Sequence, residues 1–80
     1  MTIKEALNHL LEEYPDVKAK SVVEYKNLYV FSVAKKDRPE LGVFMNPIAV
    51  IKEDGTVFTF HPLLNDPKEY FKAAKNPIKL

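Results

Sequence analysis

The sequence lacks several features on which common protein functions depend. Its 80 residues include no cysteine, so the chain has no disulfide and no thiolate that could bind a metal. Glycine occurs only at Gly42 and Gly55, which argues against a glycine-rich loop that cradles phosphate. Twelve basic residues nearly balance eleven acidic ones, whereas general nucleic-acid binding needs a strong basic excess. A local basic patch is still compatible with this neutral total.

Long apolar runs are also missing. No stretch approaches the length of a membrane span, and residues 1–5 lack the apolar segment of a signal peptide. We therefore expect a cytoplasmic protein without a membrane segment. The 46% of hydrophobic residues, nine aromatics among them, are enough for a core. A chain of this length forms one domain over 1–80, stabilised by that core or by a partner subunit.

The first residues predict a helix within 1–15. Thr2 and Glu5 have the spacing of a capping box, in which each residue satisfies a backbone N–H of the other. Pro15 disfavours helical geometry at the residue before it, so the helix should end there. The apolar residues between these signals fall on one helical stripe: Ile3, Ala6, Leu7, Leu10, Leu11 and Tyr14.

The middle of the chain, 20–61, predicts a sheet made of two hairpins, preceded by a linker. Lys26-Asn27 is a candidate turn because Asn tolerates positive φ, and Asp54-Gly55 is the stronger turn signal. Four segments have strand composition: 21–25, 28–34, 48–52 and 57–61. Both faces of the second segment are apolar, so both are expected to be partly covered. On the last segment, Phe58 and Phe60 are expected to face the core.

A short second helix is predicted over 66–76. Asp66, Pro67 and Glu69 suit its N-cap, first and third positions. Tyr70, Phe71 and Ala74 form its expected apolar side, and residues 77–80 are expected to be a frayed tail. Its lysines have the spacing of a solvated face: Lys68, Lys72 and Lys75. The expected fold is α+β, with the N-terminal helix packed on an antiparallel sheet of about four strands and a short C-terminal helix.

Catalytic and metal-binding patterns are not found. His9 and His61 have no companions at ligand spacing, and Glu12 and Glu13 point in different directions on a helix. The serines lie in predicted strands without the glycines of a nucleophile elbow. We therefore expect no enzymatic activity, no metal and no cofactor.

The candidate binding residues combine sheet aromatics, a charged loop and a histidine at a strand end. A sheet covered by one helix should leave two or three aromatics exposed, and such a face is commonly a partner surface. The second helix could instead cover that face, and the lysines could simply keep loop and edges solvated. The candidates for partner binding are Tyr29, Phe31, Lys35, Lys36, Arg38 and His61.

Residues 46–62 read Asn-Pro, an apolar strand, Glu-Asp-Gly-Thr and then Val-Phe-Thr-Phe-His-Pro. Together with the aromatic hairpin residues 28–31, this pattern resembles small uncharacterised proteins of bacteria and their prophages. It is also similar to immunity-protein-type α+β domains. The resemblance covers residues 22–72 and carries over no functional residue. It implies an accessory protein that acts by binding another protein.

The function expected from the sequence is a non-catalytic protein-binding or adaptor module. Its partner would be another protein or a second copy of the chain. One alternative is nucleic-acid binding through Lys35, Lys36 and Arg38 with Tyr29 beside them. A second alternative is a small-ligand site around His61.

Overall fold

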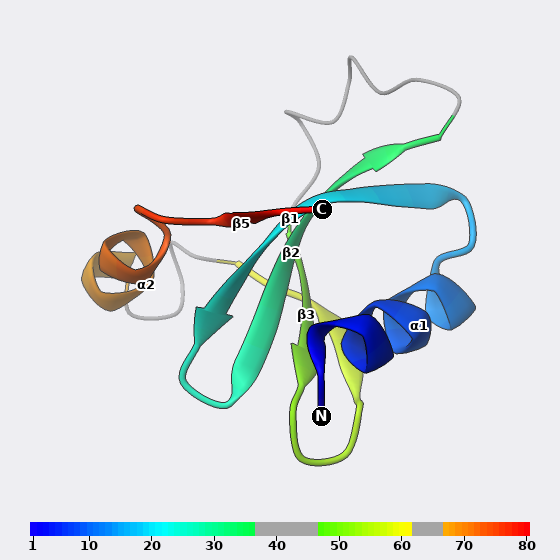
Figure 1. The fold of residues 1–80 in the computed structure, drawn as a ribbon, viewed down its shortest axis with the longest axis horizontal. Helices are drawn as coiled ribbons and strands as arrows, with labels where there is room; N and C mark the ends of the chain where they lie inside the picture. The colour runs from blue at the N-terminus through cyan, green and yellow to red at the C-terminus, as the bar shows by residue number, and fades with distance from the viewer. Residues whose placement is uncertain (37–46, 62–66) are drawn as a thin grey trace.

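A computed structural model of the chain describes residues 1–36, 47–61 and 67–80. It confirms the predicted α+β arrangement, with a helix at each end of an antiparallel sheet (Figure 1). In chain order the elements are α1 (Ile3–Glu13), β1 (Val17–Tyr25), β2 (Leu28–Lys35), β3 (Ile48–Ile51), β4 (Val57–Thr59), α2 (Pro67–Ala73) and β5 (Ile78–Lys79).

The sheet has the order β4-β3-β2-β1-β5, and every neighbouring pair is antiparallel. The two predicted hairpins are therefore joined through β2 and β3. The prediction of a frayed tail at 77–80 is wrong, because Ile78 pairs with Val22 of β1 and the Leu80 N–H donates to the Lys20 carbonyl at 3.1 Å. The edge of β1 offers unpaired backbone groups, and the tail satisfies some of them.

Strand β1 contains a bulge that sequence reasoning missed. The sheet begins at Val17, three residues before the predicted start, and its register with β2 shifts by one residue between Ala19 and Ser21. The extra residue, Lys20, reverses the alternation of side chains along the strand. As a result Val17 and Ala19 before the bulge pack into the same core as Val22 after it.

Helix α1 begins with the predicted capping box. The Glu5 N–H donates to the Thr2 hydroxyl, and the Glu5 carboxylate accepts from the Thr2 N–H, each at 3.2 Å. The hydrogen bond from the Thr2 N–H, and a second one from the Thr2 hydroxyl to the same carboxylate at 3.1 Å, lower the pKa of the Glu5 carboxyl. The helix ends at Glu13, and Tyr14 is its C-cap, as expected for a residue that precedes proline.

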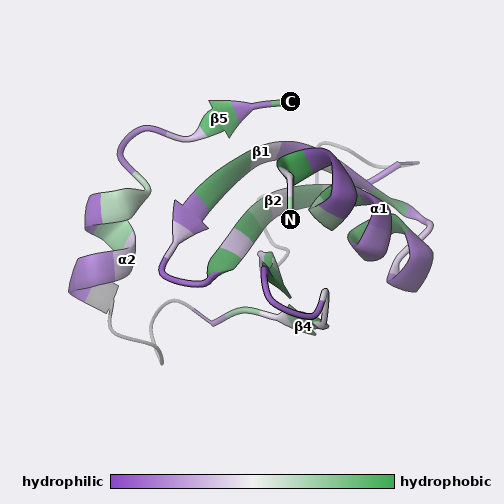
Figure 2. Cartoon of the chain, turned by 60° about the horizontal axis from the view of Figure 1, so that its bottom comes forward, coloured by the Kyte–Doolittle hydropathy of each residue, from purple (hydrophilic) through white to green (hydrophobic). Residues whose placement is uncertain are grey.

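The sheet carries an apolar core on each face. On one face α1 contributes Ala6 and Leu10, both fully buried, and on the other α2 contributes Tyr70. Figure 2 shows α1 and α2 at opposite ends of the sheet, each with hydrophilic residues on its outer side. The structure thus settles the alternative that the sequence left open, because the second helix covers the second apolar face. The second core consists of Val23, Tyr25, Val30, Ala49, Phe60 and Tyr70.

The first hairpin turn has the predicted two residues, Lys26 and Asn27, because Tyr25 pairs with Leu28 across them. In the β1–β2 turn the residue with positive φ is Lys26, at 52°, rather than Asn27. The β3–β4 turn is longer than predicted: the Gly55 N–H donates to the Ile51 carbonyl at 2.8 Å, and only Gly55 has positive φ, at 77°. The Asp54 carboxylate accepts from the Thr56 N–H at 2.9 Å, which lowers the pKa of Asp54 and closes the longer loop.

Gly55 is also held against α1, which leads to a first prediction. A Cβ at Gly55 would lie 2.9 Å from the His9 ring, and the backbone there is left-handed. We expect Gly55→Ala to lower the free energy of unfolding by about 1–3 kcal/mol. In a His9→Ala background the loss should be smaller, because only the backbone strain remains. Urea unfolding of the four proteins measures both values, and an equal loss in both backgrounds would show that the ring contributes nothing.

Candidate binding surface

The two aromatics proposed as partner-binding residues are buried. Tyr29 is 8% exposed and Phe31 0% exposed, so the prediction of an exposed aromatic sheet face is wrong for both. The physical reason is that α1 lies over this face of β2, where Ala6 and Leu10 complete the core. The Tyr29 hydroxyl also donates to the Met1 carbonyl at 3.1 Å, which anchors the N-terminus.

The other predicted residues do not form one site. Lys35 and Lys36 are exposed at the end of β2, where the Lys36 N–H donates to the Asp16 carbonyl at 3.0 Å. His61 is exposed after β4, and β3 separates β4 from β2 in the sheet. Arg38 lies outside the residues that the structure describes. The nucleic-acid hypothesis combined this basic loop with Tyr29 as a neighbouring aromatic. Because Tyr29 is buried, that hypothesis has no exposed aromatic beside the lysines.

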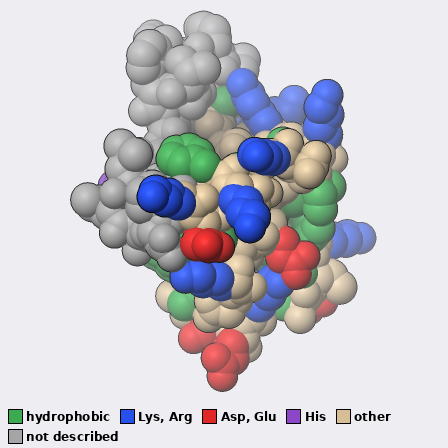
Figure 3. Space-filling model, turned by 90° about the vertical axis from the view of Figure 1, so that its left-hand side faces the viewer, with side chains coloured by type: hydrophobic (Ala, Val, Ile, Leu, Met, Phe, Trp, Pro, Cys, Tyr) green, Lys and Arg blue, Asp and Glu red, His purple; other side chains and the backbone are tan. Residues whose placement is uncertain are grey.

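Helix α2 presents a different basic and aromatic surface. Lys68, Phe71 and Lys72 are exposed at the i, i+3 and i+4 spacing of one helical face, and Lys75 is exposed two residues after the end of the helix. We call these four residues the α2 outer face. Phe71 is 53% exposed and is the only aromatic among the exposed large hydrophobic residues of the described ranges. Figure 3 views this side of the molecule, where lysines surround a hydrophobic side chain.

The placement of Phe71 corrects the prediction that it belongs to the buried side of α2, although its ring lies edge-on to that of Tyr70, 5.6 Å apart between centroids. Successive helical residues point about 100° apart, so a short helix cannot turn both rings toward the sheet. Tyr70 takes the inner position and is 7% exposed. Its ring lies 5.7 Å from the ring of Tyr25 and 5.1 Å from that of Phe60, between centroids. These contacts fix the rotation of α2 and so direct Phe71 outward.

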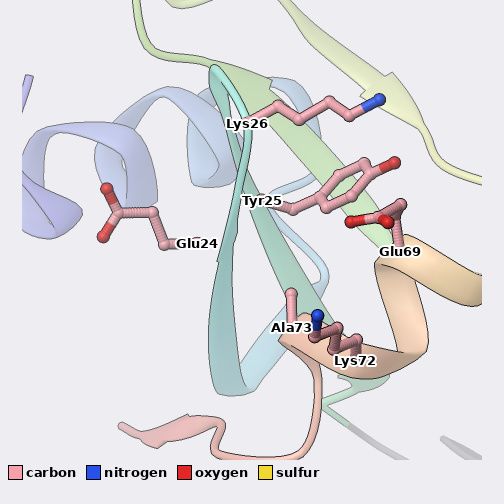
Figure 4. Close-up of a pocket in the computed structure, with 6 residues that line it drawn as sticks. All are labelled: Glu24, Tyr25, Lys26, Glu69, Lys72 and Ala73. Carbon is pink, nitrogen blue, oxygen red and sulfur yellow. The ribbon is translucent and has the colours of Figure 1, made fainter.

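A cavity of about 290 Å³ adjoins the α2 outer face, between α2 and the β1–β2 hairpin (Figure 4). The ammonium of Lys26 lies 5.2 Å from the centroid of the Tyr25 ring, on the hairpin side of this cavity. Lys72 borders the cavity from the helix side, so it belongs to both the cavity and the outer face. The lining residues are Glu24, Tyr25, Lys26, Glu69, Lys72 and Ala73.

The two carboxylates of the lining differ in what they contribute. Glu24 forms an ion pair with Lys52, whose ammonium lies 4.8 Å from the centroid of the Tyr29 ring. Tyr29 belongs to the core under α1, so this pair is on the opposite face of the sheet, and Figure 4 shows the Glu24 side chain directed away from the cavity. Glu69 lies on the cavity side with Lys26 and Lys72. The lining on this side of the sheet therefore contains two lysines and one glutamate.

The neutral total charge conceals an uneven distribution. Residues 67–80 contain four lysines and one glutamate, a net side-chain charge of +3. Helix α1 contains one lysine and three glutamates, a net charge of −2. Residues 67–80 are thus basic in a chain whose formal charge is only +1, as are residues 17–36, which contain five lysines and one glutamate. Sequence analysis identified the lysine spacing on this helix but assigned Phe71 to the buried side, so it missed the combined surface.

Other kinds of site find no support in the residues that the structure describes. Within 1–36, 47–61 and 67–80, no three His, Asp or Glu side chains gather closely enough to hold a metal ion. Over these same ranges, neither helix has the length and apolar character needed to cross a membrane. No protein-family model matches the chain, and comparisons with curated proteins and with solved structures find no match either.

The docking of α2 should depend on the ionisation of Tyr70. Burial raises the pKa of this phenol above its ordinary value of 10.0, so the unfolded chain loses the proton first as the pH rises. The stability that neutral Tyr70 contributes is complete below about pH 10 and is lost as the pH rises through the folded-state pKa. We expect Tyr70→Phe to remove this part of the alkaline loss of stability. Urea unfolding of the wild type and Tyr70→Phe between pH 8 and pH 11.5 measures the free energy of unfolding of each protein. If the two free energies fell in parallel with rising pH, the prediction would be contradicted.

Proposed function

We propose that this protein is a non-catalytic binding module that presents the α2 outer face, with the adjoining cavity, to a partner protein. The observation that carries the proposal is the half-exposed ring of Phe71 on one helical face with Lys68 and Lys72, with Lys75 exposed just beyond the helix. An exposed large aromatic inside a polar rim is the usual composition of an interface centre. The ring contacts of Tyr70 hold helix α2 against the sheet, so the Phe71 side chain has a fixed position on the surface.

The energetics are consistent with recognition by this surface. Full burial of a Phe side chain contributes about 1.5–3 kcal/mol, and each 1.4 kcal/mol is about tenfold in affinity. Lysines at the rim add little affinity in water, but they speed association with an acidic partner and disfavour a basic one. Phe71 would therefore supply affinity, and the three lysines would select the partner.

The sequence resemblance to accessory bacterial and prophage proteins supports the same proposal, because such proteins act by binding other proteins. The nucleic-acid alternative is weaker, since its aromatic, Tyr29, is buried. The small-ligand alternative places its site at His61, which does not line the cavity beside α2.

The proposal predicts that one double variant loses the partner. Phe71→Ser combined with Lys72→Glu should reduce capture of the partner from lysate of the producing organism by at least about tenfold, because it removes the apolar centre and reverses a rim charge. Lys72 is exposed, so its change should alter stability by less than about 0.5 kcal/mol. Loss of the edge-on contact between the Phe71 and Tyr70 rings should cost about 0.5–1.5 kcal/mol. Quantitative mass spectrometry of proteins retained by the immobilised chain provides the measurement.

The matched control is Lys4→Glu, which reverses the charge of an exposed lysine on α1. The wild type and Lys4→Glu should retain the same protein, and the double variant should not. Equal retention by all three proteins would refute the α2 surface as the binding site. Failure of the wild type to enrich any protein above an unrelated bait would count against a binding module altogether.

A further inference from the structure

The two edges of the sheet differ in how they are protected against pairing with another strand. Strand β5 is two residues long and includes Lys79, and a short edge strand with a lysine is a common way to block pairing. Strand β4 is the opposite edge (Figure 2), and within the described residues no strand pairs with its outer side. Residues 56–60 read Thr-Val-Phe-Thr-Phe, with no charge, proline or glycine. The β4 strand itself therefore has none of these protections.

The hydrogen bonds to β3 show which backbone groups of β4 point outward. The Phe60 N–H donates to the Pro47 carbonyl at 2.8 Å, and the Ile51 N–H donates to the Thr56 carbonyl at 2.9 Å. In an antiparallel pair, residues bonded to the partner strand alternate with residues whose N–H and C=O point the other way. The outward groups of β4 are therefore the N–H and C=O of Val57 and Thr59.

We infer that β4 pairs with β4 of a second copy of this chain, antiparallel and about a two-fold axis at Phe58. In this register Val57 of each copy lies opposite Thr59 of the other, and their outward N–H and C=O groups form four hydrogen bonds. The two Phe58 residues then form a non-hydrogen-bonded pair, the kind in which side chains approach most closely. The register uses every outward backbone group of Val57–Thr59.

A second copy suits this edge because β4 is complementary to itself. A two-fold interface places the same surface on both partners, so a charge near the axis would meet its like. No residue of β4 is charged. Valine opposite threonine and phenylalanine opposite phenylalanine are both favourable cross-strand pairs. Phe58 is only partly buried against the second core, so its pairing would extend that core across the two copies.

The size of the interface sets its strength. Four hydrogen bonds and one aromatic pair bury much less than the roughly 1,200 Å² of a stable complex, so we expect a weak dimer with a dissociation constant of about 0.1–1 mM. The pairing uses only β4 and leaves the α2 outer face to the proposed partner. The dimer and the proposed function can therefore fail separately.

NMR of the ¹⁵N-labelled full chain between about 20 μM and about 2 mM tests the inference directly. The amide shifts of Val57 and Thr59 should change with concentration, and their exchange with deuterium should slow by about two- to threefold at the high end. The Phe58 N–H points to β3, so its exchange should change less. Shifts that do not depend on concentration, or changes centred on Phe71, would overturn the inference.

A matched pair of variants separates the β4 edge from general repulsion between like-charged chains. Thr59→Lys and Ser32→Lys each add one positive charge at an exposed strand position, but only Thr59 lies on the edge. By sedimentation equilibrium, Thr59→Lys should raise the dissociation constant at least about tenfold and Ser32→Lys by less than about twofold. Equal effects would overturn the edge assignment.

Thr59→Pro gives a second test that does not involve charge. It removes an N–H that points away from β3, and proline is tolerated at such edge positions. Urea unfolding of a dilute sample should still show a cooperative transition, and the dissociation constant should rise at least about tenfold. An unchanged dissociation constant in this folded variant would overturn the inference.

Other occupants of the edge, and other self-contacts, give distinct results. If the edge takes a strand of another protein, the wild type would stay monomeric to about 2 mM, which would overturn the second copy as occupant. The double variant Phe71→Ser with Lys72→Glu should dimerise within about twofold of the wild type. Loss of its dimer would place self-association on α2 and would overturn the assignment to β4.

Discussion

The packing of Tyr70 against Tyr25 and Phe60 is the contact on which the second half of the structure depends. Helix α2 has seven residues, too few to be stable alone in water, so its tertiary contacts hold it in place. The three rings lie within 6.0 Å of one another between centroids, and Tyr25 brings β1 into the same contact. This contact covers the second face of the sheet, sets the rotation of α2 and leaves Phe71 on the outside. The packing of this core therefore determines which residues of α2 form the proposed binding surface.

Local signals predicted those parts of the fold that local physics determines. The Thr2–Glu5 capping box depends only on residues three apart, and the structure contains it as the sequence indicates. The hairpins follow from strand segments separated by short polar turns. Apolar residues on both sides of β2 required two covering layers, and α1 and α2 supply them. Each of these predictions rests on contacts between neighbours in the sequence or on the period of one element.

The wrong predictions depended on contacts between distant segments. Strand composition does not show which side of β2 receives α1, so it could not reveal that Tyr29 and Phe31 are buried. The bulge at Lys20 breaks the period that locates a strand, which is why the start of β1 was misplaced. The tail pairs with β1 through backbone groups that every residue has, so residues 77–80 gave no sign of it. Tyr70 and Phe71 are both aromatic, and only the contacts of Tyr70 with the rings of Tyr25 and Phe60 show which of the two faces the sheet.

The proposed surface combines one exposed aromatic with several lysines. Within the described ranges most large apolar residues lie in the two cores, and Phe71 is the one aromatic among the exposed large hydrophobic residues. One aromatic provides only about 1.5–3 kcal/mol, so strong selectivity of the proposed surface has to come from another source. In the proposed function, the lysines beside Phe71 would attract an acidic partner toward this surface before contact. At 0.1 M salt such attraction is screened beyond about 10 Å, so the proposed recognition would combine modest contact affinity with salt-sensitive association.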